Sequence, residues 1–397
     1  MKTLEVDKKI HSFVEKKGFA IVLFFVVSIA LLIRAYFIPI TEYSADYTIC
    51  WYPWWLEYKE YGVIGGLGRT IGDYYVPYNL IVAFSSLFPM QPCYIMALFS
   101  ILCDCLCSLY VYRFLTIPAL EKYISKKRAA LIAVCILYLP CMLLNGALWK
   151  QCDSVYTAFC VMFLYYMATE KYNKSIIAWT IGFAFKLQAI FLLPLVFLMY
   201  FIKKKFSFLT YLWIPFIFLL SGLPAILCGR SVWDTYGTYL FQTGEGAAMM
   251  TNTTNIYEFG FIDPKVCAMP AILITAVVLV LYCYKFYTIS ERVDDKDIMM
   301  MATWISWTCY MFLPRMRQRY DFLAVVLLSV YLLAFEYSNV WIAIIVNVVS
   351  LAQYSRYLFK MEMSVVWLSI PYVLMYMLFS MNVFRKMDNK AKMIEKM

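Results

Sequence analysis

The sequence predicts an all-α polytopic integral membrane protein with about twelve transmembrane helices, or thirteen in an alternative arrangement. Hydrophobic residues make up 63% of its 397 residues and charged residues only 15%, whereas a soluble domain is about half apolar and about a quarter charged. Apolar stretches of about 20 residues, long enough to cross a bilayer, recur along the chain. This composition excludes soluble, disordered and nucleic-acid-binding classes and makes a lipid bilayer the first expected partner.

Each apolar stretch is expected to form one spanning helix. The clear candidates are 19–38, 93–115, 129–147, 206–228, 265–288 and 364–384. The shorter candidates are 154–169, 174–186, 188–202, 298–313, 321–335 and 339–355. The stretch 79–90 is short and ends at Pro89 and Pro92, so we expect an interfacial or re-entrant helix on the outer face. If 79–90 crosses, it becomes the thirteenth span.

Basic residues orient this arrangement, because connections rich in Lys and Arg stay in the cytoplasm. The rule places both termini on the cytoplasmic side of a plasma membrane. We therefore expect cytoplasmic tails at 1–18 and 385–397, a core module at 19–228 and a C-terminal transmembrane module at 229–384. The long outer loops are 39–78 and 229–264. The first apolar stretch lacks a signal-peptidase pattern, so it is expected to remain as an uncleaved span.

The histidine and cysteine content narrows the kinds of catalytic and metal site that the chain can contain. The one histidine, His11, lies in the N-terminal tail, which rules out Ser-His-Asp catalysis and histidine-ligated metals within the membrane. The 13 cysteines are expected to act as small buried hydrophobes. Cys228 and Cys267 flank an outer loop, so pairing between them is the alternative.

Asp46 is the first candidate functional residue. It lies in the first outer loop, soon after Arg34 at the mouth of the first span. A carboxylate there can act as general base toward a hydroxyl; the equal alternative is a solvated loop residue. The glycine-rich segment 62–72 lacks the G-K-[ST] of a phosphate-binding loop and is interpreted as a flexible turn between two interfacial helices.

Two further polar clusters fall on the same expected side. The segment 145–154 contains Gln151 and Asp153, and the next hairpin contains Lys186 and Gln188. An ionisable group at membrane depth is costly and is a functional candidate by default. The alternative for Lys186 is a side chain that extends to the interface.

A fourth cluster, L-P-R-M-R-Q-R-Y-D at 313–321, contains Arg315, Arg317, Arg319 and Tyr320. Three arginines on the outer side oppose the positive-inside bias, so a local anion is expected, and phosphate is the natural one. The alternative is pairing with Asp321 and Glu258.

Asp104 lies in the middle of an expected span. We expect it to pair with Arg34 or Arg113 in a structural role.

Together these segments resemble the bacterial relatives of GPI mannosyltransferases, within the GT-C superfamily of polyprenyl-phosphate-sugar-dependent glycosyltransferases. The matching features are an aspartate in the first outer loop, W-K-Q-C-D-S at 149–154, F-K-L-Q at 185–188 and L-P-R-M-R-Q-R-Y at 313–320. The family typically has W-G-Q-x-D-S and M-H-E-R-Y, so Lys150 replaces a glycine, and Arg317 and Gln318 replace His-Glu. The resemblance covers residues 34–325 and leaves the sugar and the acceptor open.

The resemblance implies a GT-C fold with juxtamembrane helices in the first outer loop, and a sugar donor on a polyprenyl monophosphate. Asp46 would be the catalytic base. Substrate and phosphate binding would fall to Gln151, Asp153, Lys186, Gln188, Arg315, Arg317, Arg319 and Tyr320. No metal or other cofactor is expected, and the partners are the lipid-linked donor and a glycan or lipid-linked acceptor. The alternatives are a lipid-linked sugar transporter or flippase, and a polysaccharide polymerase or ligase.

Overall fold

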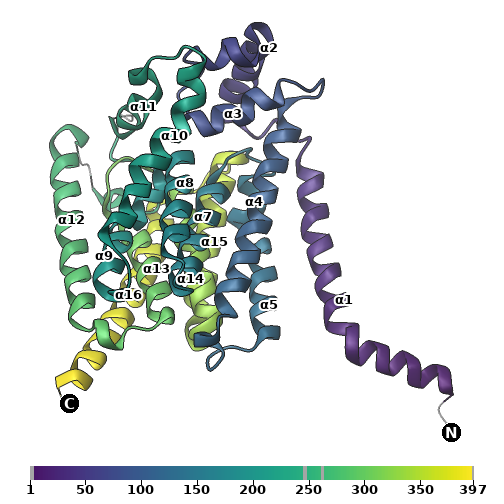
Figure 1. Cartoon of the computed structure of the whole chain (residues 1–397), viewed down its shortest axis with the longest axis vertical. Coiled ribbons are helices and arrows are strands. Elements are labelled where there is room, and N and C mark those ends of the chain that lie inside the picture. Colours follow the sequence, from purple (N-terminus) through teal and green to yellow (C-terminus); the bar gives the residue numbers. More distant parts are fainter. Residues whose placement is uncertain (1–3, 245–247, 261–262, 396–397) are drawn as a thin grey trace.

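Helices make up almost all regular structure in the computed structural model, which describes residues 4–244, 248–260 and 263–395 (Figure 1). Within these ranges the strands are β1 (Met250–Thr251) and β2 (Met316–Arg317), which pair in parallel. The all-α prediction is therefore confirmed. Residues 245–247 and 261–262 of the expected outer loop, and residues 1–3 and 396–397 of the tails, lie outside the described residues.

Several helices are suited to a bilayer. Large apolar side chains are exposed along α1 and α12, among them Phe24 (67%) and Val280 (66%), and such continuous apolar surface marks contact with an apolar medium. The chain is a membrane protein. Seven helical segments of the described residues are long and apolar enough to cross: Glu5–Phe37 (α1), Pro92–Leu115 (α4), Phe208–Leu227 (with α10, Trp213–Leu227), Pro264–Thr288 (α12), Gln318–Phe335 (with α14, Phe322–Phe335), Tyr337–Leu358 (with α15, Val340–Leu358) and Val365–Glu395 (α16).

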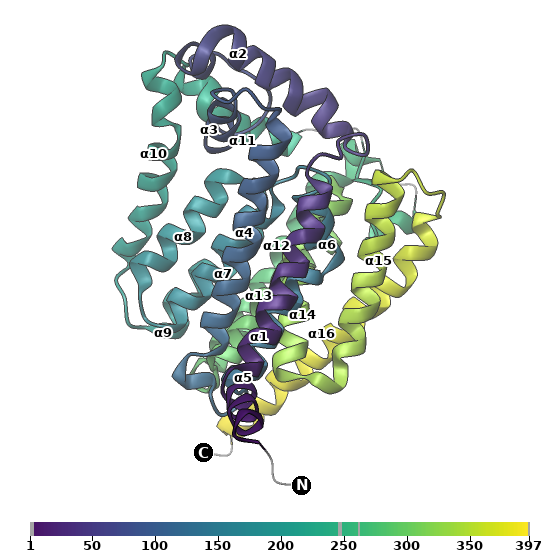
Figure 2. The same cartoon turned by 90° about the vertical axis from the view of Figure 1, so that its right-hand side faces the viewer.

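Among the remaining helices, α7 and α13 lie in the interior of the bundle. α7 packs between α4 and α8, and α13 packs along α14 (Figures 1 and 2). Nearly every residue of α13 and α14 is buried, as expected for helices surrounded by protein. The bounds are α5 Lys126–Cys135, α6 Pro140–Asn145, α7 Asp153–Ala168, α8 Tyr172–Phe185, α9 Leu193–Lys203 and α13 Asp295–Phe312.

The expected span 129–147 is not one helix. The chain breaks into α5, a 3₁₀ turn at Ile136–Tyr138 and α6. Pro140 causes the break, because proline disfavours helical geometry at the preceding residue, and Leu139 is extended (ψ 135°). The expected cytoplasmic tails are largely helical, because α1 begins at Glu5 and α16 continues to Glu395.

The two ends of the bundle differ. α2 (Tyr52–Leu67), α3 (Val76–Ser85) and α11 (Val232–Gly244) lie at one end, and both chain ends lie at the other (Figure 1). The ten residues of α3 reach only about 15 Å, too short to cross a bilayer. The glycine-rich segment is partly helical: α2 continues through a kink at Gly62 (φ 70°). We call this the α2/α3 end.

A buried ion pair joins α1 to the bundle, and it is the pairing predicted for Asp104. Arg34 Nε donates to Asp104 Oδ2 at 2.9 Å, and both side chains are 1% exposed. The same guanidinium donates to the carbonyl oxygens of Ala30 and Leu137, so one arginine links three segments. Every cysteine is a free thiol, so Cys228 and Cys267 are not paired.

Replacing Asp104 with leucine is expected to destabilise the protein by about 3–5 kcal/mol, because it leaves the Arg34 charge buried without a carboxylate. Thermal unfolding of the purified protein in detergent measures this. The double variant Arg34→Met, Asp104→Leu buries no charge and should recover most of the loss. A single variant as stable as the wild type would contradict the assigned role.

Candidate active site

The four polar clusters found along the sequence meet at the α2/α3 end. Asp46 directly precedes a π-helical turn, Tyr47–Trp51, which continues into α2. Such turns are rare and occur often at functional sites. The side chain of Asp46 is 22% exposed, so solvent or a substrate can reach it.

Donors from two other segments surround the Asp46 carboxylate. Trp149 Nε1 donates to Oδ2 at 2.9 Å, and Gln151 Nε2 donates to the same oxygen. The hydroxyl of Tyr357 donates to Oδ1 at 3.1 Å. These contacts fix the orientation of the carboxylate, so Asp46 is not a freely solvated loop residue.

Arg319 joins Asp46 to the second cluster. Its Nη1 lies 3.5 Å from Asp46 Oδ2, and its Nε lies 3.9 Å from Asp153 Oδ2. The guanidinium also lies over the Trp149 ring, 5.2 Å from its centroid, which adds a cation–π attraction. The alternative partner Asp321 accepts instead from the Tyr372 hydroxyl at 3.3 Å.

Asp153 is the buried acid of the site. It is the first residue of α7, where the helix dipole favours negative charge, and Asn145 Nδ2 donates to its Oδ2 at 2.8 Å. Lys186 Nζ lies 2.7 Å from its Oδ1. Lys186 is 3% exposed, so it is buried in an ion pair and does not extend to the interface.

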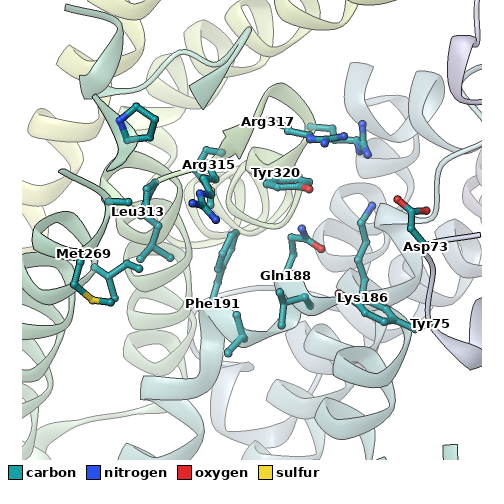
Figure 3. A pocket seen from close by; sticks show the side chains of 18 of the residues that line it. Asp73, Tyr75, Lys186, Gln188, Phe191, Met269, Leu313, Arg315, Arg317 and Tyr320 are labelled. Atoms are coloured by element: carbon teal, nitrogen blue, oxygen red, sulfur yellow. The ribbon is translucent and has the colours of Figure 1, made fainter. Parts of the chain in front are cut away.

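A cavity of about 570 Å³ adjoins this network. Figure 3 shows Lys186, Arg315 and Arg317 spread around it, with Asp73 on the same side as Lys186. Gln188 and Tyr320 complete its polar wall. Among the described residues its basic side chains are Lys186, Lys265, Arg315, Arg317 and Arg319. This excess of positive charge suits an anion.

Metal binding has no evident site in the part of the chain that the structure describes, where no three His, Cys, Asp or Glu side chains group to hold an ion. Asp46 and Asp153 are instead bridged by Arg319. Asp46 is placed to accept a proton, and the basic side chains next to it can bind an anion.

Lys150, which stands where the motif W-G-Q-x-D-S has a glycine, has a structural role. Its backbone is left-handed (φ 64°), a conformation that glycine adopts without strain. Nζ donates to the carbonyl oxygens of Phe37 and Ile40 at 3.1 and 3.0 Å, and to two within its own loop. Burial lowers the pKa of Lys150 to about 8, and the carbonyl oxygens favour its protonated form.

Two substitutions at this position separate strain from hydrogen bonding. Both Lys150→Ala and Lys150→Gly lose the ammonium contacts, but only alanine keeps the left-handed strain. Lys150→Gly should therefore be the more stable variant by about 1 kcal/mol. Chemical or thermal unfolding of both proteins checks this. Equal stability would mean that the strain at Lys150 is negligible.

Tyr357 and Lys265 belong to the site but were not among the sequence-based candidates. Tyr357 contacts Asp46 but lies at the end of an expected span. The polar and aromatic segment 353–357 was a usable signal there. Lys265 lies at the start of α12, where a lysine near a membrane surface has no distinguishing pattern.

Comparison with known proteins adds no assignment. No protein-family model matches the chain, and no curated protein matches its sequence.

Proposed function

We propose that the chain is an integral membrane glycosyltransferase of the GT-C type. It transfers a sugar from a polyprenyl monophosphate to a cell-envelope glycan or lipid-linked acceptor. One observation carries the proposal: Asp46 contacts Arg319, and Arg319 lines a cavity whose basic side chains exceed its acidic ones. A base next to an anion site is the arrangement that transfer from a phosphate requires.

The reaction uses the two sides of this arrangement differently. An acceptor hydroxyl attacks the anomeric carbon and gives its proton to Asp46, and the new C–O bond forms. The bond from that carbon to the phosphate oxygen breaks, and its electron pair leaves with the polyprenyl phosphate. Attack opposite the leaving group inverts the anomeric centre. Cations in the cavity stabilise the charge that grows on the phosphate in the transition state.

An apolar groove supports a lipid-linked donor. It has a volume of about 680 Å³ and lies between α9 and α12, lined by residues such as Phe197, Phe201 and Val280. Phe191, in the turn just before α9, and Met269 of α12 line the cavity of about 570 Å³, which we call the basic cavity. We propose that the polyprenyl chain of a donor whose phosphate occupies the basic cavity lies along this groove.

The topology belongs to the proposal as well. We place the α2/α3 end outside the plasma membrane, with twelve spans and both termini cytoplasmic. Nucleotide sugars are absent on that side, so a lipid-delivered donor is needed. Gln188, Tyr320 and Asp153 orient the sugar or the cations, and the reaction needs no metal.

The test uses the purified full chain in lipid nanodiscs. It is supplied with synthetic polyprenyl monophosphate sugars and with glycolipids extracted from cell envelopes. The expected products are free polyprenyl phosphate and a glycoside of inverted configuration. A polymerase or ligase would instead consume a lipid diphosphate donor, and a flippase would move the donor without cleaving it. Either result would replace the proposed function.

A further inference from the structure

A second cavity, of about 620 Å³, lies where α15 ends and turns into α16. Its wall includes Tyr357 and Arg356 from the last turn of α15, and Lys360 and Glu362 from the connection. Asn252, just after β1, closes another part of it.

Each of the two cavities is lined by a residue that contacts Asp46. Tyr357, which lines the second cavity, donates to Asp46 Oδ1. Arg319, which lines the basic cavity, faces Asp46 Oδ2. The two linings also meet at the short sheet: Arg317 of β2 lines the basic cavity, its partner Thr251 lies in β1, and the next residue, Asn252, lines the second cavity.

The contacts of Asp46 indicate the side from which a hydroxyl arrives. Each carboxylate oxygen has two lone pairs. Oδ2 accepts from Trp149 and Gln151 and also faces Arg319. Among the described residues, Oδ1 accepts a hydrogen bond from Tyr357 alone, so it has a lone pair left for a second hydroxyl. Oδ1, next to Tyr357, is therefore the oxygen with room for an acceptor hydroxyl, whereas Oδ2 faces Arg319.

Charge indicates what kind of molecule fits there. Arg356 and Lys360 place two positive charges on the cavity wall, against one carboxylate, Glu362. Glu258 acts electrostatically on Arg356 from outside the lining. Lys360 has a left-handed backbone (φ 52°) just past the end of α15, where glycine is the usual residue.

We propose that the second cavity binds the acceptor, and that the acceptor is a saccharide carrying a negative group held by Arg356 and Lys360. This inference rests on the proposed function. The acceptor hydroxyl gives its proton to Asp46 Oδ1 as its oxygen bonds to the anomeric carbon, while the phosphate leaves into the basic cavity. The negative group is a carboxylate or a phosphate, since both fit the same cations.

The experiment measures binding, so it does not depend on turnover. Benzyl β-D-glucoside, benzyl β-D-glucuronide and benzyl β-D-glucoside 6-phosphate are titrated onto the purified full chain in nanodiscs, followed by saturation-transfer NMR. At least one charged probe should bind about tenfold more tightly than the neutral glucoside, the gain expected from a charge-assisted hydrogen bond. The tighter of the two charged probes identifies the carboxylate or the phosphate.

Variants test the location. Arg356→Gln should abolish the preference for the charged probe. Lys360→Gly should reduce it, and this variant folds because glycine relieves the left-handed strain. Lys59→Gln removes one positive charge from α2 at the same end and should keep the preference. Equal binding of all three probes, no binding of either charged probe, or a preference that survives both site variants overturns the inference.

The proposed function can fail separately. A chain that binds the charged probe through Arg356 but never cleaves a polyprenyl monophosphate sugar would keep the site and lose the reaction. A chain that cleaves the donor but shows no charge preference would keep the reaction and lose the anionic acceptor.

Discussion

Asp46→Asn is expected to lower the rate of sugar transfer by about 10²–10⁴, the usual cost of losing a general base. Asparagine keeps the size of the side chain and can still accept from Trp149 Nε1, so the surrounding network should persist. It lacks the charged oxygen that takes the acceptor proton. The measurement is the initial rate of polyprenyl phosphate release by purified protein at saturating donor.

The matched control is Glu42→Gln. It makes the same isosteric change four positions earlier in the same loop, on an exposed side chain, and should transfer at the wild-type rate. Thermal unfolding of both variants shows whether the fold is intact. A folded Asp46→Asn protein that transfers sugar near the wild-type rate would remove Asp46 from the mechanism.

The helices were largely predictable because each depends on a local apolar run. The expected spans 154–169 and 298–313 agree with α7 and α13 to within a few residues. The prediction of a single helix at 129–147 was wrong because one proline hardly changes the average hydropathy of the stretch. Length and hydropathy alone also leave the number of crossings open, since a helix such as α13 is surrounded by protein.

The site was predictable as a set of polar clusters but not as a geometry. Each residue was selected from its local sequence: Asp46 as a carboxylate at the mouth of the first span, Asp153 and Lys186 from polar clusters between expected spans, and Arg319 from an arginine cluster that opposes the positive-inside bias. That they form one connected network depends on packing between distant segments. Tyr357 shows the limit: the polar and aromatic segment 353–357 was visible in the sequence, but nothing local connects it to Asp46, which lies 311 positions away.

Arg319→Lys is expected to impair donor use, and Arg319→Ala to impair it further. The guanidinium faces Asp46 and Asp153 and stacks over Trp149, so its planar fork is held in one orientation. Lysine keeps the charge but cannot reproduce that geometry. Loss of one charge-assisted bond to the phosphate costs about 1.5–3 kcal/mol, which corresponds to roughly 10–100-fold in turnover at limiting donor.

Arg317→Lys provides the comparison, because it makes the same substitution two positions away in the same cavity. Arg317 is exposed, and its head group is less constrained, so lysine should replace it with a smaller loss. A donor titration with each variant separates the two positions. If Arg319→Ala keeps both its turnover and its donor dependence, the phosphate lies elsewhere in the cavity. Lys186 is then the next position to test, because its ammonium group is buried against Asp153 and lines the same space.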